Sequence, residues 1–233
     1  MPTVFISGAT GYLGRPLTQA LVTAGFDVHA LTRPQSIRKL PLGCRPIPGN
    51  ALDPATFQHA VPPQTTYIHL TGVAHPSPAK AKEFRTIDQA SFEASLQAAR
   101  ANRAKHFIYV SVAHPAPVMR DYIDVRRHCE SRLLQSQIPA TILRPWYILG
   151  EGHRWPLILI PFYKLAEAIP STRTTAQRLG LVTRDQMLAA LKSAATNPAP
   201  STAQILDVSA IRAATSASAS ALSLPRRPSA LSA

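Results

Sequence analysis

The sequence predicts an α/β fold in which a doubly wound parallel sheet is covered by helices on both faces. Short β-branched and aromatic runs alternate along the chain with segments of helical periodicity, which is the pattern of successive βαβ units. Strands that alternate with helices in this way imply a parallel sheet covered on both faces. The first run ends in a glycine-rich turn that leads directly into a helical segment. Right-handed crossovers between such units give a Rossmann-type sheet.

The expected elements follow one another in regular order. Strands are expected at residues 3–7, 26–33, 44–50, 66–72, 106–112, 140–149 and 203–208. Helices are expected at residues 15–25, 53–61, 83–103, 121–136 and 181–197. Gly25 supplies the stop of the first helix. Asp53 caps the second helix, with Pro54 in its first turn, and Thr183 caps the last.

The 233 residues are enough for one large domain, which we expect to span residues 1–208. Elements around residues 150–180 would form a small substrate-side region. The apolar segment 153–170 is expected to be a helix packed over the substrate cleft or a dimer contact. Residues 209–233 contain 15 Ala or Ser and no acidic residue, and such low-complexity sequence predicts a disordered tail.

Composition excludes several classes of protein. The two cysteines, Cys44 and Cys129, exclude a disulfide scaffold, and the scattered histidines give no metal-ligand spacing with them, so we expect no metal site. No apolar run approaches the ~20 residues that cross a bilayer. The opening residues carry no secretory signal pattern. We therefore expect a soluble cytoplasmic protein without a membrane span, and its oligomeric state stays open.

The net charge of +13 results from 25 Lys and Arg against 12 Asp and Glu. The excess is spread along the chain and forms no polybasic run, which is typical of a solvated basic face. The same excess could attract an anionic ligand. No recognition motif accompanies the charge, so we do not expect a nucleic-acid partner.

A glycine motif between the first strand and the first helix carries the strongest functional signal. Its glycines permit a tight turn and let a pyrophosphate approach the backbone, while the helix N-terminus supplies N–H groups and partial positive charge. A glycine turn in an unrelated α/β protein is the alternative. The cofactor-binding residues predicted here are Gly8, Thr10, Gly11, Tyr12, Leu13 and Gly14.

The end of the second strand indicates which dinucleotide binds. An NAD site places an acidic residue there to hold the ribose hydroxyls, whereas this chain has Leu31-Thr32-Arg33, with Arg38 shortly after. A guanidinium can hold a 2′-phosphate through two hydrogen bonds. The pattern therefore favours NADP(H) over NAD(H), with a solvated arginine as the alternative.

Taken together, these segments resemble a short-chain dehydrogenase/reductase, and more narrowly the atypical, NmrA-like or NAD(P)H-binding group. The resemblance covers roughly residues 1–208 and is more specific for fold and dinucleotide binding than for the reaction. It rests on GATGYLGR, on Thr32-Arg33, on Gly49-Asn50-Ala51, on Leu70-Thr71-Gly72, and on the later block YVSV, RDYIDVR and ILRPWYILG.

The resemblance implies further cofactor contacts at the ends of later strands. Asn50 and Ala51 would lie beside the adenine. Thr71 and Gly72 would line the ribose and nicotinamide side, and Pro145 would lie against the nicotinamide. Each is a loop position at the carboxyl end of a predicted strand, where open α/β sheets bind their ligands.

The resemblance also implies an active site made of a serine, a tyrosine, and a lysine four residues after the tyrosine. Here these positions are Ser111, Tyr122 and Arg126. Tyr122 would be the acid/base and Ser111 the partner of the substrate oxygen. Arg126 would bind the ribose and bias the pKa of the tyrosine, but it stays protonated and cannot relay a proton. A strand-end serine and a packed tyrosine are the alternative, and the interval of 11 residues is short for the family.

The sequence therefore predicts an NADP(H)-dependent oxidoreductase acting on a small, hydrophobic, carbonyl or quinone-like substrate. An aromatic cluster beyond the sixth strand could wall such a pocket, or it could be core and lid packing; its members are Trp146, Tyr147, Trp155, Phe162 and Tyr163. The alternative is a non-catalytic NAD(P)(H)-binding protein with a regulatory or assembly role, which the arginine at position 126 favours.

Overall fold

A computed structural model of the chain describes residues 1–116, 118–150, 180–199 and 203–214. Its centre is a seven-stranded sheet in the order β3-β2-β1-β4-β5-β6-β9, and every pairing in it is parallel. The strands are β1 Thr3–Ser7, β2 Asp27–Thr32, β3 Arg45–Pro48, β4 Thr66–His69, β5 His106–Val110, β6 Ala140–Leu143 and β9 Gln204–Leu206. The predicted fold class is confirmed.

The order of the strands reverses at β1, which lies between β2 and β4. The chain first winds outward to β3 and then crosses back to β4 on the other side of β1. Ser7 at the end of β1 pairs with Leu31 of β2 and with His69 of β4, so the three strands end at nearly the same level. A crevice outside the carboxyl ends of the strands at such a switch point is where open α/β sheets bind ligands.

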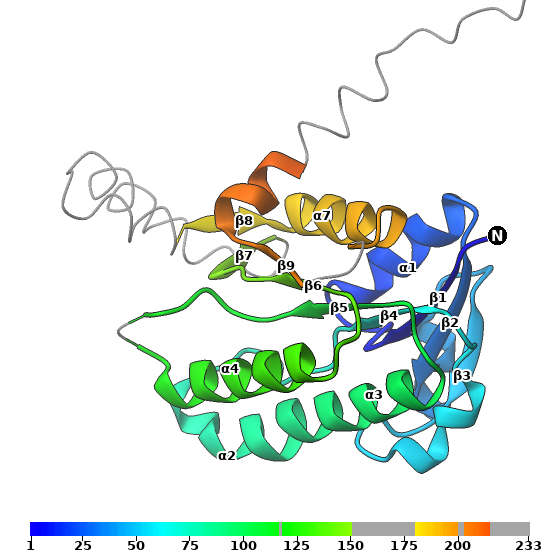
Figure 1. The fold of residues 1–233 in the computed structure, drawn as a ribbon, viewed down its shortest axis with the longest axis horizontal. Helices are drawn as coiled ribbons and strands as arrows, with labels where there is room; N and C mark the ends of the chain where they lie inside the picture. Colours follow the sequence, from blue (N-terminus) through cyan, green and yellow to red (C-terminus); the bar gives the residue numbers. More distant parts are fainter. Residues whose placement is uncertain (117, 151–179, 200–202, 215–233) are drawn as a thin grey trace, which may run out of the picture.

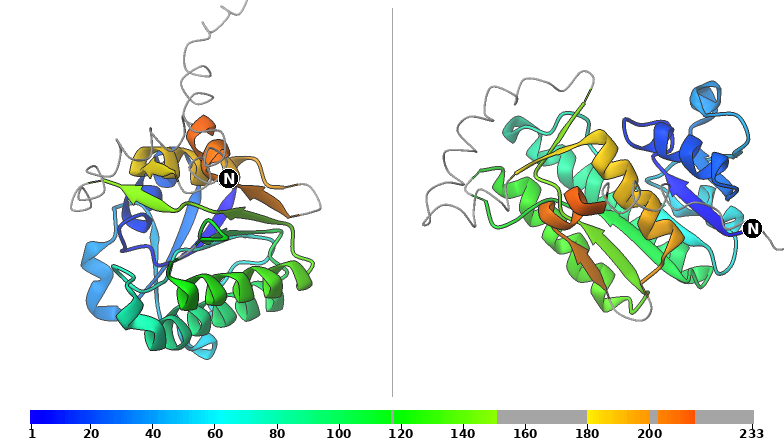
Figure 2. Two further views of the ribbon diagram at one scale, coloured as in Figure 1. Left: turned by 90° about the vertical axis from the view of Figure 1, so that its left-hand side faces the viewer. Right: turned by 90° about the horizontal axis from the view of Figure 1, so that it is seen from above.

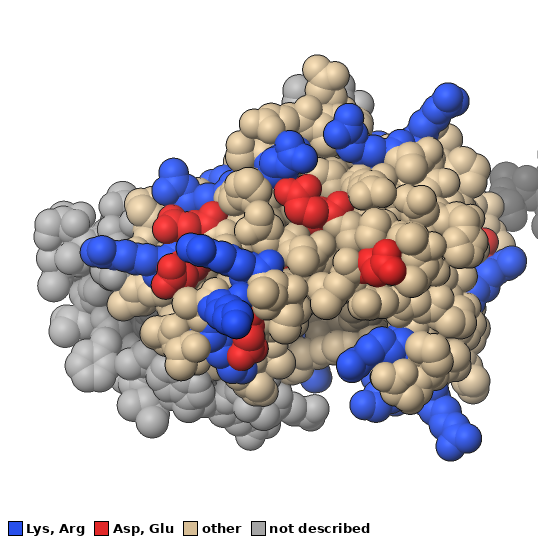
Figure 3. Space-filling model, turned by 90° about the horizontal axis from the view of Figure 1, so that it is seen from below, with Lys and Arg blue, Asp and Glu red and all other residues tan. Residues whose placement is uncertain are grey.

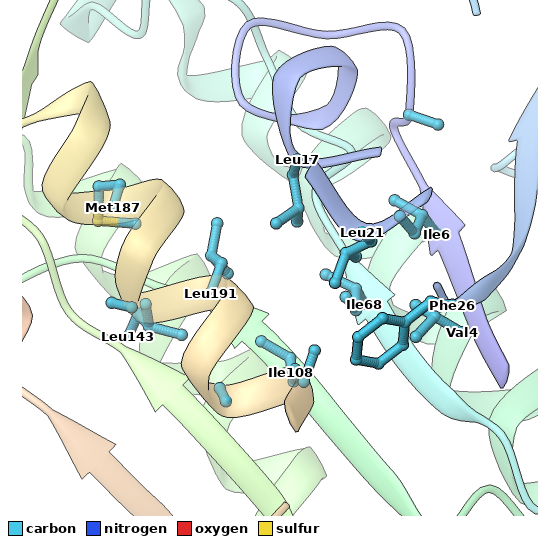
Figure 4. Packing of buried hydrophobic residues seen from close by; sticks show 14 of the residues in the cluster. Val4, Ile6, Leu17, Leu21, Phe26, Ile68, Ile108, Leu143, Met187 and Leu191 are labelled. Carbon is cyan, nitrogen blue, oxygen red and sulfur yellow. The ribbon is translucent and has the colours of Figure 1, made fainter. Parts of the chain in front are cut away.

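One face of the sheet is covered by α1 Gly14–Thr23 and α7 Arg184–Thr196, which lie together above it in Figures 1 and 2. Both helices place apolar side chains on the strands, Leu17 and Leu21 from α1 and Leu191 from α7, as Figure 4 shows. Thr183 caps α7 as predicted, and its side chain accepts a hydrogen bond from the Gln186 backbone N–H.

The other face is covered by α3 Ala90–Ala101 and α4 Arg120–Gln135, below the sheet in Figure 1. Its core is aromatic, because alternate residues of the same strands point to this side. The rings of Tyr67 and Phe107 are stacked with centroids 5.2 Å apart, and Phe5 lies 5.0 Å from Tyr67. Burying each such side chain stabilises the fold by about 1.5–3 kcal/mol.

Two predicted helices differ from the structure. The segment 53–61 consists of two 3-10 turns, η2 Pro54–Thr56 and η3 Gln58–Ala60, since Phe57 between them has a φ of −143°. Asp53 still caps the first turn by accepting a hydrogen bond from Ala55 N–H. The predicted helix 83–103 begins earlier, at α2 Ala81–Glu83, and passes through the π-helical turn η5 Phe84–Gln89 before α3. The structure also contains 3-10 turns that the sequence did not predict, η1 Pro34–Lys39 and η4 Pro78–Lys80.

The predicted strand 140–149 is two strands in different sheets. After β6 the chain leaves the main sheet at Pro145, which has no N–H to donate, and continues as β7 Tyr147–Leu149. β7 pairs in parallel with β8 Leu181–Thr183, which directly precedes α7. Of the predicted substrate-side region, residues 151–179 lie outside the described part of the chain, together with the aromatic residues 155, 162 and 163.

The structure describes a further segment past residue 208, where the sequence analysis placed the end of the domain. Residues 208–214 are helical, and Val208 and Ile211 are buried in the same core cluster as the apolar side chains of α7. Arg212 donates two hydrogen bonds to the Leu181 carbonyl, at 3.0 and 2.7 Å. Val208 and Ile211 are three residues apart, as one face of a helix requires. The sequence analysis missed this pair because the segment around it is rich in Ala and Ser. The rest of the predicted tail, residues 215–233, lies outside the described residues.

The surface formed by the helices below the sheet carries mixed charges. In Figure 3, acidic side chains lie among several of the Lys and Arg side chains on this face. One example is Arg132, whose Nε lies 3.2 Å from a carboxylate oxygen of Glu93. No helix within the described ranges is both long and apolar enough to cross a membrane.

Residues 208–214 should contribute to stability through Ile211. The Ile211→Ala variant should lose about 2–5 kcal/mol of unfolding free energy, because it leaves a cavity in the core. Ile205→Ala is the matched control: that side chain is 45% exposed against 0% for Ile211 and should cost less than about 1 kcal/mol. Urea denaturation of both variants measures the difference, and equal losses would contradict the burial of residues 208–214.

Candidate functional site

The parallel sheet brings most of the sequence-predicted residues to one edge. Gly8 follows β1, Arg33 follows β2, Asn50 lies shortly after β3, Thr71 shortly after β4, and Ser111 follows β5. Because all these strands run in the same direction, their carboxyl ends meet along the same edge of the sheet. The sequence therefore predicted which residues share this edge, although it did not predict their contacts.

The glycine turn after β1 is closed so tightly that two of its positions have no room for a side chain. Gly8 has a φ of +80°, and a β-carbon there would lie 2.6 Å from the Leu70 carbonyl carbon at the end of β4. A β-carbon on Gly14 would overlap the carbonyl oxygen of Gly8. Gly11 N–H donates a 3.0 Å hydrogen bond to that same oxygen. The turn thus brings backbone, rather than side chains, to the start of α1.

Helix α1 begins with an N-terminus that no side chain caps and with no acidic residue in its first turn. A pocket of about 430 Å³ lies against it, lined by Thr10, Gly11, Tyr12, Arg15, Pro16 and Arg184. The positive end of the helix dipole and two guanidinium groups suit an anion. The residues present therefore fit the diphosphate of a dinucleotide.

The predicted 2′-phosphate residues, Arg33 and Arg38, are both exposed at the end of β2. Arg33 directly precedes the 3-10 turn η1 and Arg38 lies in its last turn; the first hydrogen bond of η1 runs from Ser36 N–H to the Arg33 carbonyl at 2.8 Å. Asn50 is exposed, and its side-chain oxygen accepts a hydrogen bond from Leu52 N–H at 3.1 Å, so it orders its own loop.

The loop after β4 is held by a carboxylate that the sequence analysis missed. Asp88, on the π-helical turn η5, accepts a 2.6 Å hydrogen bond from Val73 N–H. A β-carbon on Gly72 would lie 2.9 Å from Asp88 Oδ1 and 3.0 Å from Arg126 Nη2, so only glycine fits without displacing them. Thr71 Oγ1 is buried and has no hydrogen-bond partner among the described residues.

Asp88 forms a buried ion pair with Arg126, with 3.3 Å between Oδ2 and Nη2. The two residues are 2% and 7% exposed. Arg126 Nη1 also donates to the Val110 carbonyl at 3.0 Å and to the Tyr109 hydroxyl at 3.3 Å. The guanidinium carbon lies 4.9 Å from the Tyr122 ring centre and 5.7 Å from that of Tyr109. Such a pair withstands burial only because several partners replace the lost water.

The pKa of Tyr122 is raised above its ordinary value. Burial is the dominant cause, the Arg126 charge lowers the pKa, and the Asp88 carboxylate raises it. Burial also raises the pKa of Asp88, although Arg126 opposes it. The Tyr122 hydroxyl is therefore protonated around neutral pH and can serve as a proton donor.

Ser111 and Pro145 take up neighbouring positions at the ends of β5 and β6. Ser111 is buried and its N–H donates to the Leu143 carbonyl at 2.8 Å, while its hydroxyl has no hydrogen-bond partner among the described residues. The Pro145 carbonyl accepts a 2.9 Å hydrogen bond from Ala113 N–H. Within the described residues no hydrogen bond joins Ser111 to Tyr122, so the structure brings the two to the same edge without a direct bond.

The sequence did contain a signal for Asp88. It lies four residues after Phe84, on the apolar side of the segment 83–103, where a carboxylate needs a partner. A second missed acid, Glu130, is four residues after Arg126 and forms a bidentate pair with Arg144. Arg15 directly follows the glycine motif, whereas Arg184 carried no comparable signal, since its approach to the pocket depends on tertiary packing.

The thiols and the other titratable groups form no metal centre within the described ranges, where no group of three His, Cys, Asp or Glu side chains could hold an ion. Burial raises the pKa of Cys129 to about 11 and also raises that of Cys44. Both thiols are thus protonated at neutral pH.

The family model described as NAD(P)H-binding matches residues 8–156 of the chain, which includes the glycine turn and the Tyr122 region. Among solved structures, the Bordetella bronchiseptica enzyme WbmH in complex with NAD+ superposes with a TM-score of 0.67 at 17% identity, covering 98% of this chain and 83% of that one. At this identity the likeness concerns the fold alone.

Two curated relatives are similar to the chain, one named as a reductase and the other as an assembly factor. A ceramide reductase of Caulobacter vibrioides is 26% identical over 208 residues, which is 88% of this chain and 64% of the relative. The photosystem II assembly factor Ycf39 of Trieres chinensis is 29% identical over 150 residues, 61% of this chain and 44% of the relative. The chain thus spans less than two thirds of the length of either relative.

Removing Asp88 should leave the Arg126 charge buried without its partner. The Asp88→Ala variant should lose about 3–5 kcal/mol of unfolding free energy in urea denaturation. In a double-mutant cycle, Asp88→Ala combined with Arg126→Met should lose clearly less than the sum of the two single losses. Strictly additive losses would contradict a direct energetic coupling between these two side chains.

Proposed function

The chain belongs to the NAD(P)H-binding family, and from this premise we propose that it is an NADP(H)-dependent oxidoreductase that reduces a small hydrophobic carbonyl or quinone-like substrate. The observation that carries the proposal is the glycine cradle at the start of α1. Gly8, Gly11 and Gly14 would hold the diphosphate through their backbone, and the buried Thr71 hydroxyl would find its partner on the bound nucleotide. A bound reduced nicotinamide supplies a hydride.

Tyr122 is the proton donor in this proposal. Because its pKa is raised, the hydroxyl carries its proton around neutral pH and can give it to the substrate oxygen as the carbonyl is reduced. Ser111 would hold the same oxygen, using a hydroxyl that has no hydrogen-bond partner among the described residues. Arg126 would hold the Tyr122 ring in place through a cation–π contact, and it cannot itself relay a proton. After the reaction, Tyr122 would take up a new proton from solvent.

A hydrophobic substrate is supported by the loop between β5 and α4. Val118 is 54% exposed beside the half-buried Met119, directly before the helix that carries Tyr122. A ceramide reductase is among the relatives, and its name denotes a lipid substrate. NADP(H) is favoured by Arg33 and Arg38, which stand exposed at the end of β2 without an acidic residue between them.

A second candidate function is non-catalytic binding of NAD(P)(H) with a regulatory or assembly role. The specific observation that favours it is the Asp88–Arg126 ion pair. Where the superfamily pattern has a lysine, this chain holds a guanidinium that is already engaged by a carboxylate and a backbone carbonyl. The similarity to an assembly factor supports the same candidate.

The cofactor preference should depend on Arg33. A charge-assisted contact contributes about 1.5–3 kcal/mol, so NADPH should bind at least about tenfold more tightly than NADH, and Arg33→Ala should narrow that gap. Arg100→Ala, which removes an exposed arginine on α3, is the control and should change neither affinity. Calorimetric titration of both cofactors measures the ratio, and equal affinities in the wild-type protein would refute the NADP(H) assignment.

Turnover should depend on the Tyr122 hydroxyl. Tyr122→Phe keeps the ring and should lower NADPH oxidation with a carbonyl or quinone substrate by about 10²–10⁴-fold, with little change in NADPH affinity. A variant as active as wild type would exclude Tyr122 as the donor. If the wild-type protein binds NADPH normally but oxidises it with no member of a lipophilic carbonyl and quinone panel, the second candidate function is favoured instead.

A further inference from the structure

A second buried carboxylate on α4 contacts the segments that follow β5 and β6. Glu130 is 3% exposed and lies about one helical turn after Arg126. It accepts two hydrogen bonds from Arg144, which directly follows β6. It also accepts one of 3.4 Å from Nε2 of His114, which lies beyond the end of β5. One carboxylate therefore joins α4 to the ends of two neighbouring strands.

The contact between His114 and Glu130 is a hydrogen bond of a neutral imidazole. Burial is the main reason why the pKa of His114 is lowered; the charges of Arg144 and Arg127 lower it as well, while the Glu130 carboxylate raises it. A carboxylate can only accept a hydrogen bond, so the neutral ring carries its proton on Nε2. The His114 side chain is 15% exposed, and the contact is thus largely shielded from water.

Two successive turns of α4 hold the chain on either side of Ser111. Arg126 donates a 3.0 Å hydrogen bond to the carbonyl of Val110, the residue before Ser111. Glu130, one turn later on the helix, accepts from His114, three residues after Ser111. The position of Ser111 relative to α4 is therefore fixed from both directions along the chain.

The same segment is also bonded to the chain that continues from β6. Ser111 N–H donates to the Leu143 carbonyl at 2.8 Å, and Ala113 N–H donates to the Pro145 carbonyl at 2.9 Å. Arg144 lies between these two acceptors and directs its guanidinium to the Glu130 carboxylate. The segment after β5, the end of β6 and α4 thus converge on one side chain.

We infer that His114 is a positioning residue for the proposed reaction, because its bond to Glu130 sets where the Ser111 hydroxyl lies relative to Tyr122. Tyr122 belongs to α4 and Ser111 to the segment after β5, and among the described residues no hydrogen bond joins the two directly. A misplacement of about 1 Å between reacting groups can lower a rate by about 10²-fold. The inference rests on the proposed function, since it names a residue that acts through Ser111.

His114→Leu tests this role, because it removes the hydrogen bond and leaves the pair of Glu130 and Arg144 in place. The kcat for NADPH oxidation with 2-decanone or a decyl-substituted benzoquinone should fall at least about tenfold, while calorimetry should show an unchanged affinity for NADPH. His114→Gln, whose amide can still donate to Glu130, should keep most of the activity. His128→Leu is the matched control: it removes a 3.6 Å contact with Glu93 on the exposed side of α4 and should change neither quantity.

A double-mutant cycle separates positioning from a purely structural role. If His114 acts through Ser111, His114→Leu should cost no further activity in a Ser111→Ala background. Independent losses in kcat would overturn the positioning role, and so would equal losses in His114→Gln and His114→Leu. A loss that only follows the fraction of unfolded protein, measured by circular dichroism at the assay temperature, would identify His114 as purely structural.

Failure of the proposed function gives a different result. A wild-type protein that binds NADPH but oxidises it with neither probe would overturn the proposed function, and the positioning role with it. An active wild-type protein and an equally active His114→Leu variant would overturn the positioning role alone.

Discussion

The close approach of two backbone segments in the glycine turn determines where the site can be. The α-carbon of Gly14 packs against the carbonyl of Gly8, and Gly8 in turn packs against the backbone of Leu70 after β4. This contact places the start of α1 directly over the carboxyl end of β1, at the point where the strand order reverses. A side chain at either glycine would push the helix away from β1 and β4 together. The uncapped helix N-terminus is useful to an anion only because this contact holds it beside the crevice.

The order of strands and helices in the main sheet could be predicted from the sequence because each kind of element has its own residue pattern. Buried parallel strands are short apolar runs, and the helices between them show helical periodicity, so the order of elements could be predicted without tertiary information. The errors occurred where local sequence and tertiary contacts disagree. Residues 140–149 were predicted as one strand, but Pro145 diverts the chain into a second sheet. Residues 208–214 consist mostly of small residues, and their tertiary contact is made by Ile211, which is buried in the same core cluster as α7.

The candidate site could also be predicted where it depends on the order of the strands, and not where it depends on tertiary contacts. Residues that follow parallel strands share an edge, so Gly8, Thr71 and Ser111 could be grouped from the sequence alone. Arg184 could not, since its position depends on how α7 packs beside α1. Asp88 was an intermediate case: a carboxylate on an apolar helix face signals a buried partner, but the sequence does not say that the partner is Arg126.

The Asp88–Arg126 pair constrains the chemistry as much as it supports the fold. A lysine in this position can exchange protons and move between partners, whereas a guanidinium stays charged and here is held by Asp88 and by the Val110 carbonyl. In the proposed reaction, the proton given to the substrate then comes from Tyr122 itself. Burial raises the pKa of Tyr122 and so keeps the proton on its hydroxyl around neutral pH. A protonated hydroxyl can donate a proton but cannot accept one as a general base. If the protein is an enzyme, the same burial that secures the ion pair therefore biases it toward reducing its substrate.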